Sequence, residues 1–274
     1  MDATVPHLAR RLMGRADLHI HSLASDGVSG IAEILDAAEQ RELEVIAITD
    51  HERIDAGVAA QRMARDTGRR VQVIVGEEIT TRGGHLIGLF LTERIRPWAS
   101  LKTSVARIHE QGGIAIVAHP LVPYPLCARA GAIRSLLAEQ DEIFHPDGIE
   151  AFNPTTAGMR WTRRVPEFVA ETGRAPIGSS DAHRAADVGQ AFTTFEGSTP
   201  EELRAAIQAS DTGWEGSFYS WRSQVAMFRQ QLRKNARALR DDIGGKVRRD
   251  GTGRDLGYPG GRQRPVRFDP EGEP

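Results

Sequence analysis

Short apolar runs alternate with longer amphipathic stretches from Arg15 to about Ser210. This alternation is typical of strand–helix units that build a largely parallel sheet. Seven strands are predicted, with Ala191–Phe195 as a possible addition: Ala16–His21, Glu44–Thr49, Val71–Thr80, His85–Leu91, Gly113–Ala118, Gly148–Phe152 and Ala175–Gly178. Helices are predicted where apolar residues recur at helical spacing: Gly30–Arg41, Ala56–Thr67, Leu101–Glu110, Val165–Thr172 and a last one opened by Pro200. The pattern therefore predicts an α/β fold.

Histidine and acidic residues stand at the C-terminal ends of five of the predicted strands. The segments are Asp17–His21, Thr49–Glu52, Gly76–Glu78, Ala118–Pro120 and Ser179–His183. Because residues two apart on a strand share a face, Asp17, His19 and His21 are predicted to point together. In a parallel barrel all C-terminal strand ends meet at one mouth, so the pattern favours a closed or distorted barrel over an open sheet.

The residue types at these ends indicate divalent metals. Imidazole and carboxylate without thiolate suit Zn, Mn or Fe, and the chain has a single cysteine, Cys127. A structural zinc site closes with four ligands, whereas this chain offers more donors than one closed site uses. Several metals joined by a bridging carboxylate are therefore expected.

The motifs D-L-H-I-H, I-T-D-H, G-E-E-I, A-H-P and S-D-A-H resemble the successive motifs of the PHP family, named for its polymerase and histidinol phosphatase members. The resemblance covers about Arg15 to Ser210. It implies a distorted (βα)7 barrel that holds a trinuclear metal centre.

The same resemblance implies which residues bind each metal. The first metal would be held by His19, His21, Glu78 and Asp181, the second by Glu78 as a bridge with His85 and His119, and the third by Asp26, His51 and His183. Some members have a histidine where this chain has Asp26, and in this respect the chain resembles the small nucleotide- and RNA-directed phosphoesterases.

Further residues beside these motifs are expected to assist. Asp17 and Asp50 are expected to orient an imidazole by accepting its second N–H, and Asp181 and His183 to take part in catalysis. Asn153 and Arg160 are candidates for contact with a substrate phosphate, against the alternative of a loop-capping Asn and a solvated Arg. His109 is expected on a helix surface.

We therefore expect a metal-dependent phosphoesterase, in which metal-activated hydroxide attacks a phosphate mono- or diester in line. The substrate is expected to be a nucleotide, a nucleic-acid end or a small phosphorylated metabolite. Histidinol-phosphatase-like activity and a metal-binding module that binds a partner remain alternatives. Amidohydrolase-like cleavage of a C–N or C–O bond is a further alternative, but no lysine suited to bridging metals accompanies the motifs.

Composition and charge bound the remaining expectations. One cysteine and no signal-like or membrane-length apolar run favour a cytoplasmic protein with no membrane partner, and leave the oligomeric state open. Four parts are expected: an N-terminal segment 1–14, a barrel domain 15–215, an amphipathic helical extension 216–243 and a flexible basic tail 244–274. The stretch from Gly216 to Pro274 holds 13 Lys or Arg against 7 Asp or Glu.

Overall fold

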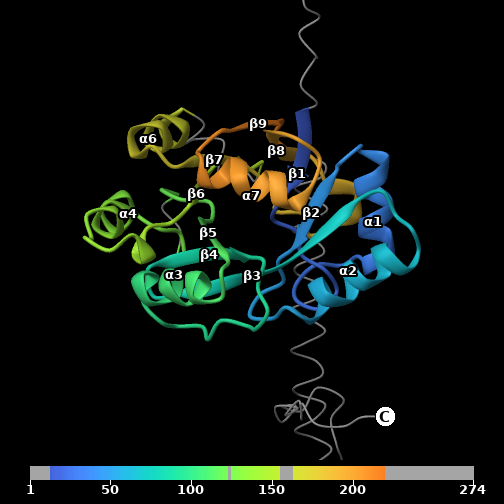
Figure 1. Cartoon of the computed structure of the whole chain (residues 1–274), viewed down its shortest axis with the longest axis horizontal. Helices are drawn as coiled ribbons and strands as arrows, with labels where there is room; N and C mark the ends of the chain where they lie inside the picture. The colour runs from blue at the N-terminus through green and yellow to red at the C-terminus, as the bar shows by residue number, and fades with distance from the viewer. Residues whose placement is uncertain (1–12, 123–124, 155–162, 220–274) are drawn as a thin grey trace, which may run out of the picture. The chain divides into compact units, whose positions relative to one another are not determined.

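A computed structural model describes residues 13–122, 125–154 and 163–219 (Figure 1). Within these residues nine strands form one sheet in the order β7-β6-β5-β4-β3-β2-β1-β8-β9. The strands are β1 Met13–Asp17, β2 Val45–Ile48, β3 Gln72–Thr81, β4 Gly84–Leu89, β5 Ile114–Val117, β6 Gly148–Phe152, β7 Ala175–Gly178, β8 Ala191–Glu196 and β9 Thr212–Gly216. β1, β2 and β3 pair in parallel, as do β5, β6 and β7, and β4 is antiparallel to both of its neighbours.

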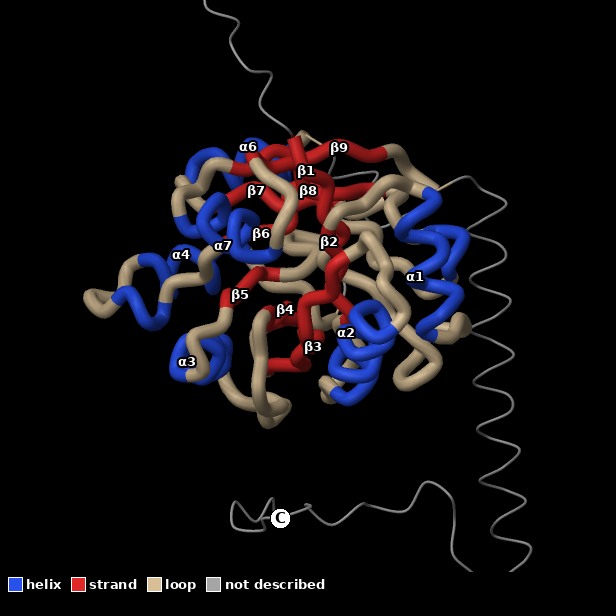
Figure 2. The backbone as a smooth tube through the Cα atoms, turned by 45° about the vertical axis from the view of Figure 1, so that its right-hand side comes forward, coloured by secondary structure: helices blue, strands red, loops and turns tan. Residues whose placement is uncertain are grey.

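Side-chain hydrogen bonds join the two edges of the sheet. The Thr193 hydroxyl of β8 donates to the carbonyl of Gly178 at 2.9 Å and accepts from its N–H at 3.1 Å. The Thr212 hydroxyl of β9 donates to the carbonyl of Pro176 at 2.8 Å. Because Gly178 and Pro176 belong to β7, the sheet curls until its ends meet, and the result is a nearly closed, distorted barrel (Figure 2). The expected α/β fold class is confirmed.

Six helices lie on the outside of the strands in the described part of the chain (Figures 1 and 2). They are α1 Ile31–Gln40, α2 Asp55–Asp66, α3 Leu101–Glu110, α4 Ala130–Leu137, α6 Arg164–Thr172 and α7 Pro200–Gln208, with short 3-10 turns η1 Glu142–Phe144 and η2 Ala185–Asp187. α7 begins as the sequence predicts: Thr199 caps it by accepting from the N–H of Glu202, and Pro200 opens its first turn. Among the described residues, no helix combines the length and the apolar run that crossing a membrane requires.

Alternating side chains of the strands fill two kinds of core. Val45 and Ala47 of β2 join an apolar cluster with residues of β3, β5, β7 and α7, whereas Ile46 and Ile48 pack with α1 and α2. This is the two-residue period of a strand that is buried on both faces. The strands therefore form a rigid frame whose C-terminal ends carry the histidines and acids.

The structure departs from the predicted elements at several places. β1 starts at Met13 and ends at Asp17, and neither α4 nor β9 was predicted. β4 runs against its neighbours, so the sheet is mixed rather than largely parallel in this region. The segments expected at 1–14 and 216–243 lie mostly outside the described residues, as do Arg160 and the whole tail 244–274. The four-part division of the chain stays a prediction.

His109 is half-buried and bonded on both ring nitrogens, so the expectation of a surface histidine is wrong. Its Nε2 lies 2.8 Å from an Asp147 carboxylate oxygen and its Nδ1 lies 2.8 Å from the carbonyl of Ile143. Both partners accept hydrogen bonds, so the doubly protonated ring fits best. Burial alone lowers the pKa of His109, but the hydrogen bond with Asp147 outweighs it and holds this pKa above the usual 6.5.

This pair predicts a pH-dependent contribution to stability. Because the folded pKa is raised, the contribution is fully present below about pH 6.5 and is lost as the pH rises through the folded pKa. His109→Gln is expected to lower the free energy of unfolding by about 1 to 2 kcal/mol at pH 6, and by less at pH 9. Urea denaturation of both proteins at the two pH values measures this; an equal loss at both would contradict a charged His109.

Candidate metal centre

Histidines and acids from six strands meet at one end of the barrel. His19 and His21 follow β1, His51 follows β2, His119 follows β5, and Asp181 and His183 follow β7. Glu78 lies within β3, where the strand has left β2 and pairs with β4. His85 is the second residue of β4 and so lies near its N-terminal end. Since β4 is antiparallel to β3 and β5, its N-terminal end lies at the same mouth as their C-terminal ends.

Glu78 is the centre of this arrangement. Its Oε2 lies 3.3 Å from ring nitrogens of His19, His21 and His51. Its Oε1 lies 2.6 Å from Nδ1 of His85 and 3.1 Å from Nε2 of His119. The two oxygens of one carboxylate thus face two different groups of imidazoles. This division is what a bridging ligand between two metals requires.

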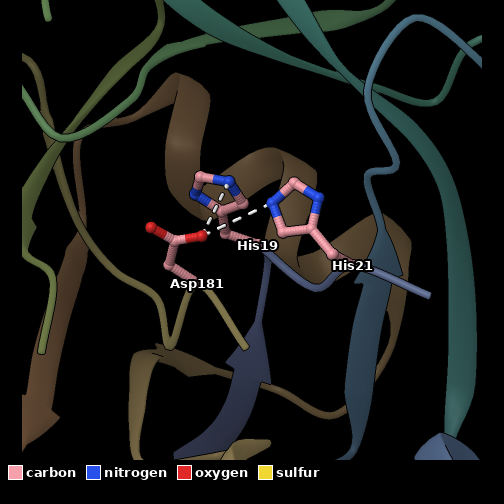
Figure 3. Close-up of side chains that lie close together, drawn as sticks. All are labelled: His19, His21 and Asp181. Carbon is pink, nitrogen blue, oxygen red and sulfur yellow. Dashed lines mark ion pairs between the residues drawn. The ribbon is translucent and has the colours of Figure 1, made fainter. Parts of the chain in front are cut away.

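Asp181 and Asp26 complete the cluster on either side. Oδ1 of Asp181 lies 3.5 Å from Nε2 of His19 and 3.4 Å from Nε2 of His21, and Figure 3 shows the carboxylate facing both rings. Asp26 reaches His183 Nε2 at 3.0 Å and His21 Nδ1 at 3.3 Å. His51 lies between the two ends of the cluster, with its Nε2 at 3.8 Å from Asp26.

The cluster is buried on one side and open on the other. The side chains of His19 and His21 are fully buried. Those of His51, Asp26 and His183 are 30%, 27% and 20% exposed. The cluster is therefore open to solvent on the side of these three residues.

The donor set fits divalent cations. Three buried ring nitrogens, His19 Nε2, His21 Nε2 and His85 Nδ1, have no hydrogen-bond partner of acceptable geometry among the described residues, and all three face Glu78. Four overlapping sets of three donors lie with all atoms within 4.8 Å of one another: His19, His21 and Asp181; His19, Glu78 and His119; His21, His51 and Glu78; and His21, Asp26 and His183. Imidazole and carboxylate in such sets suit borderline divalent metals.

The electrostatics of the site agree with this. Burial raises the pKa of Glu78, but the surrounding histidines, His19 first, outweigh it and hold that pKa well below its usual range. Burial likewise lowers the pKa of His21, but the nearby carboxylates of Asp181 and Glu78 outweigh it and raise this pKa to about 10. The carboxylates therefore stabilise positive charge at the imidazoles. A metal ion that replaced the imidazole protons would supply such a charge.

The structure turns Glu78, and not its neighbour Glu77, toward the imidazoles. Glu77 is on the other face of β3, where its Oε2 accepts a hydrogen bond from the N–H of Ile95 at 2.7 Å. Burial raises the pKa of Glu77 to about 8. Glu77 therefore lies outside the cluster and carries a neutral carboxyl group at neutral pH.

Asp17 and Asp50 do not orient imidazoles directly, so that expectation is wrong. Asp17 accepts hydrogen bonds from the N–H and hydroxyl of Ser180, at 3.0 and 2.5 Å, and from the N–H of Gly189. Asp50 accepts from the N–H and hydroxyl of Ser22 and from the hydroxyl of Ser25 at 2.5 Å. Both carboxylates tie together the loops that carry the candidate ligands.

The reason lies in the end of β1. The predicted alternation places Asp17 with His19, but β1 ends at Asp17. Leu18 packs in the same cluster as Ala16, whereas Ile20 packs with α1 and α2. The alternation of faces is therefore interrupted between Leu18 and Ile20, and Asp17 faces away from the imidazoles.

Glu150 takes the role that was expected of Asp17, and the sequence analysis missed it. This fully buried carboxylate lies within β6, with Oε1 at 2.9 Å from Nδ1 of His19. Its Oε2 accepts from the backbone N–H of His119 at 2.6 Å and from the amide of Asn153 at 3.3 Å. The available signal was an acid inside the apolar strand G-I-E-A-F. Accepting the Nδ1 proton directs the Nε2 lone pair of His19 toward Glu78.

Two other residues also contact the candidate ligands. The Asn153 amide donates to Oδ2 of Asp181 at 3.2 Å, so it holds a side chain of the site. Sγ of Cys127 lies 3.4 Å from Nδ1 of His119. His145 lies elsewhere, with its Nε2 at 3.0 Å from the carbonyl of Glu139.

Two family models and several known proteins are similar to this chain. The PHP domain model matches residues 17–142, and the PHP-associated model matches residues 160–212. An uncharacterised protein of Methanocaldococcus jannaschii is 38% identical over 152 residues, covering 51% of this chain and 81% of that protein. A 5'-3' exoribonuclease of Haemophilus influenzae is 33% identical over 104 residues, covering 36% of this chain and 37% of the relative.

A solved structure shares the fold. The crystal structure of a two-domain protein of Bacteroides vulgatus, containing a predicted PHP-like metal-dependent phosphoesterase, superposes with a TM-score of 0.62 at 18% identity. The match covers 80% of this chain and 70% of the other. The two family models and the 38% identical relative confirm the resemblance carried by the sequence motifs: the chain belongs to the PHP domain family.

Proposed function

We propose that the chain is a metal-dependent phosphoesterase that hydrolyses a phosphate mono- or diester of a nucleotide, a nucleic-acid end or a small phosphorylated metabolite. One observation carries the proposal: a single buried carboxylate, Glu78, divides its two oxygens between two groups of imidazoles. Membership of the PHP domain family supports the reaction class, and the relative named as an exoribonuclease supports nucleic-acid esters among the candidates.

In this proposal three divalent ions, Zn, Mn or Fe, bind to the cluster. The proposed ligands are His19, His21, Glu78 and Asp181 for one ion, Glu78, His85 and His119 for another, and Asp26, His51 and His183 for the third. The first set is supported by the grouping of His19, His21 and Asp181, and the second by the contacts of Glu78 with His85 and His119 at 2.6 and 3.1 Å. In the third, Asp26 lies 3.0 Å from His183 and 3.8 Å from His51. When bound, such ions would lower the pKa of bound water to near neutrality and offset the charge of a phosphoryl group.

The chain's own residues prepare the site for that reaction. Glu150 holds the proton of His19 at Nδ1, which leaves Nε2 free to bind. Asn153 keeps the carboxylate of Asp181 in place, and Asp17 and Asp50 brace the adjoining loops. The exposed edge formed by Asp26, His51 and His183 leaves room for the phosphoryl group to meet the cluster.

Metal loading tests the proposal. After supplementation with Mn or Zn, the purified protein is expected to hold more than one equivalent of metal, because the donors exceed those that one ion uses. It is expected to hydrolyse at least one member of a panel of nucleotides, short RNA and sugar phosphates, to lose activity in EDTA and to regain it when metal returns. Elemental analysis and phosphate or nucleotide release measure the two quantities.

Specific outcomes would contradict this reading. One ion or fewer per chain after supplementation would exclude the multinuclear centre. Hydrolysis of amide substrates with none of phosphate esters would favour the amidohydrolase alternative. His109→Gln is a matched control, because it removes a histidine that lies outside the cluster, and it should retain both metal content and activity.

A further inference from the structure

The turn that carries Asp181 has a backbone conformation that needs support. Asp181 has φ 52°, in the left-handed region that favours glycine. For a residue with a side chain this conformation is strained and persists only where neighbours hold it. In this conformation the carboxylate of Asp181 faces both His19 and His21.

Hydrogen bonds hold most of this turn. The N–H and hydroxyl of Ser180 donate to Asp17, and the N–H of Ala182 donates to the carbonyl of His19 at 3.2 Å. The carbonyl of Ala182 accepts from the N–H of His21 at 2.8 Å. The carbonyl of Ser180 accepts from the hydroxyl of Tyr219 at 2.5 Å.

The Ser180 carbonyl affects the backbone conformation of Asp181. It belongs to the same planar peptide group as the N–H of Asp181. Rotation of this peptide about the N–Cα bond of Asp181 changes φ of Asp181, and with it the direction of the side chain. A donor that fixes the Ser180 carbonyl therefore restrains φ of the candidate ligand.

Tyr219 is well placed to act as this donor. It is 4% exposed, and its backbone N–H donates to the carbonyl of Pro154 at 3.2 Å. Ser217, two residues earlier, is tied to the carbonyl of Gln190 at 3.1 Å. Burial raises the pKa of the Tyr219 phenol well above its usual value, and the carboxylates of Asp181 and Asp187 raise it further. The phenol thus stays protonated and can donate.

We propose that Tyr219 is a positioning residue for metal binding: its hydroxyl fixes the Ser180 carbonyl and so holds the Asp181 carboxylate against His19 and His21. The inference rests on the proposed metal-dependent function and assigns to it a residue from outside the five motifs. Tyr219 touches neither substrate nor metal in this role. Its effect passes through one peptide group.

Tyr219→Phe in the full chain tests this, because it removes the hydroxyl and keeps the ring. The expected result is a loss of affinity of at least about 10-fold for the most weakly bound Mn or Co ion, as for other residues that orient metal ligands. Competition with a chelator measures the affinity, and the visible spectrum of the Co-loaded protein should change. kcat should fall at limiting metal and recover at excess metal, with KM little changed.

Thr212→Val is the matched control. It also removes a hydroxyl that donates to a backbone carbonyl, but this carbonyl belongs to Pro176 within β7 and not to the turn that carries Asp181. Both variants are expected to lower Tm, and only Tyr219→Phe to weaken metal binding. Unchanged affinity and an unchanged Co spectrum in Tyr219→Phe would overturn the inference. A wild-type protein that binds no metal would instead overturn the proposed function itself, so the two failures are distinguishable.

Discussion

Glu78→Gln is expected to abolish hydrolysis and to lower the number of bound metals. Glutamine keeps the size of the side chain but removes its charge and one of the two acceptor oxygens that face the imidazoles. Residues that merely orient metal ligands contribute about 10- to 100-fold to affinity or activity, so loss of a bridging ligand should cost at least about 100-fold in kcat/KM. Elemental analysis and steady-state kinetics on a responsive substrate measure both effects.

The chain supplies a close control in the preceding residue. Glu77→Gln makes the same change on the other face of β3. Because burial raises the pKa of Glu77 to about 8, its carboxyl group is neutral at pH 7, and glutamine mimics that state. This variant should keep its metals and its activity. Equal losses of metal and activity in both variants would mean that Glu78→Gln disturbs the structure of β3 and that Glu78 is not a metal ligand.

His19→Ala and Asp181→Ala should behave like Glu78→Gln while the barrel stays folded. The core of the barrel lies in its apolar clusters, which contain neither residue. Circular dichroism separates the loss of the site from the loss of the fold.

The sequence alone predicted the frame of the molecule well. Short β-branched apolar runs such as Val45–Ile48 indicate central strands, and amphipathic stretches such as Leu101–Glu110 indicate covering helices, as the structure has them. Strand β9 could not be predicted in this way. Thr212–Gly216 has two glycines in five residues and no buried residue, so its sequence shows no apolar pattern typical of a strand.

The candidate site was predictable only in part. Histidines at strand ends follow from local pattern and the common direction of parallel strands. His85 does not, because its place at the mouth depends on β4 being antiparallel, and only the family resemblance pointed to it. The partners of Asp17 and Asp50 could not be foreseen either, since an interrupted alternation after β1 decides which way Asp17 faces.

Long-range contacts account for the remaining residues. Glu150 is 131 positions from His19, and Tyr219 is 39 positions from Ser180. No local period links residues so far apart, and each pair meets only because the sheet closes on itself. An acid within the apolar strand β6 was a usable signal for Glu150. For Tyr219 there was none, since a single tyrosine after a glycine-rich strand is unremarkable.

The activity is expected to rise from weak below about pH 6 to a maximum under mildly alkaline conditions. A histidine nitrogen must lose its proton before it binds a metal, and the usual pKa of histidine is near 6.5. In this site burial lowers the pKa of His19 and His119, but nearby groups, including Asp181 for His19 and Cys127 and Glu78 for His119, raise it well above that value.

Protons therefore compete with metals for the imidazole nitrogens over a wide range of pH. Metal affinity increases with pH because each bound ion displaces protons. Activity should also increase with pH because water bound to the metals would lose a proton more readily as the pH rises. A hydrolase that relied on a pair of carboxylic acids would keep its maximum in acid. The measurement is a kcat/KM profile from pH 5 to 9 at saturating metal, with proton release on metal binding followed by calorimetry in two buffers of different ionisation enthalpy. A maximum near pH 5 that survives EDTA would exclude metal-assisted hydrolysis, because neither the imidazoles nor the water would then be in the form that the reaction needs.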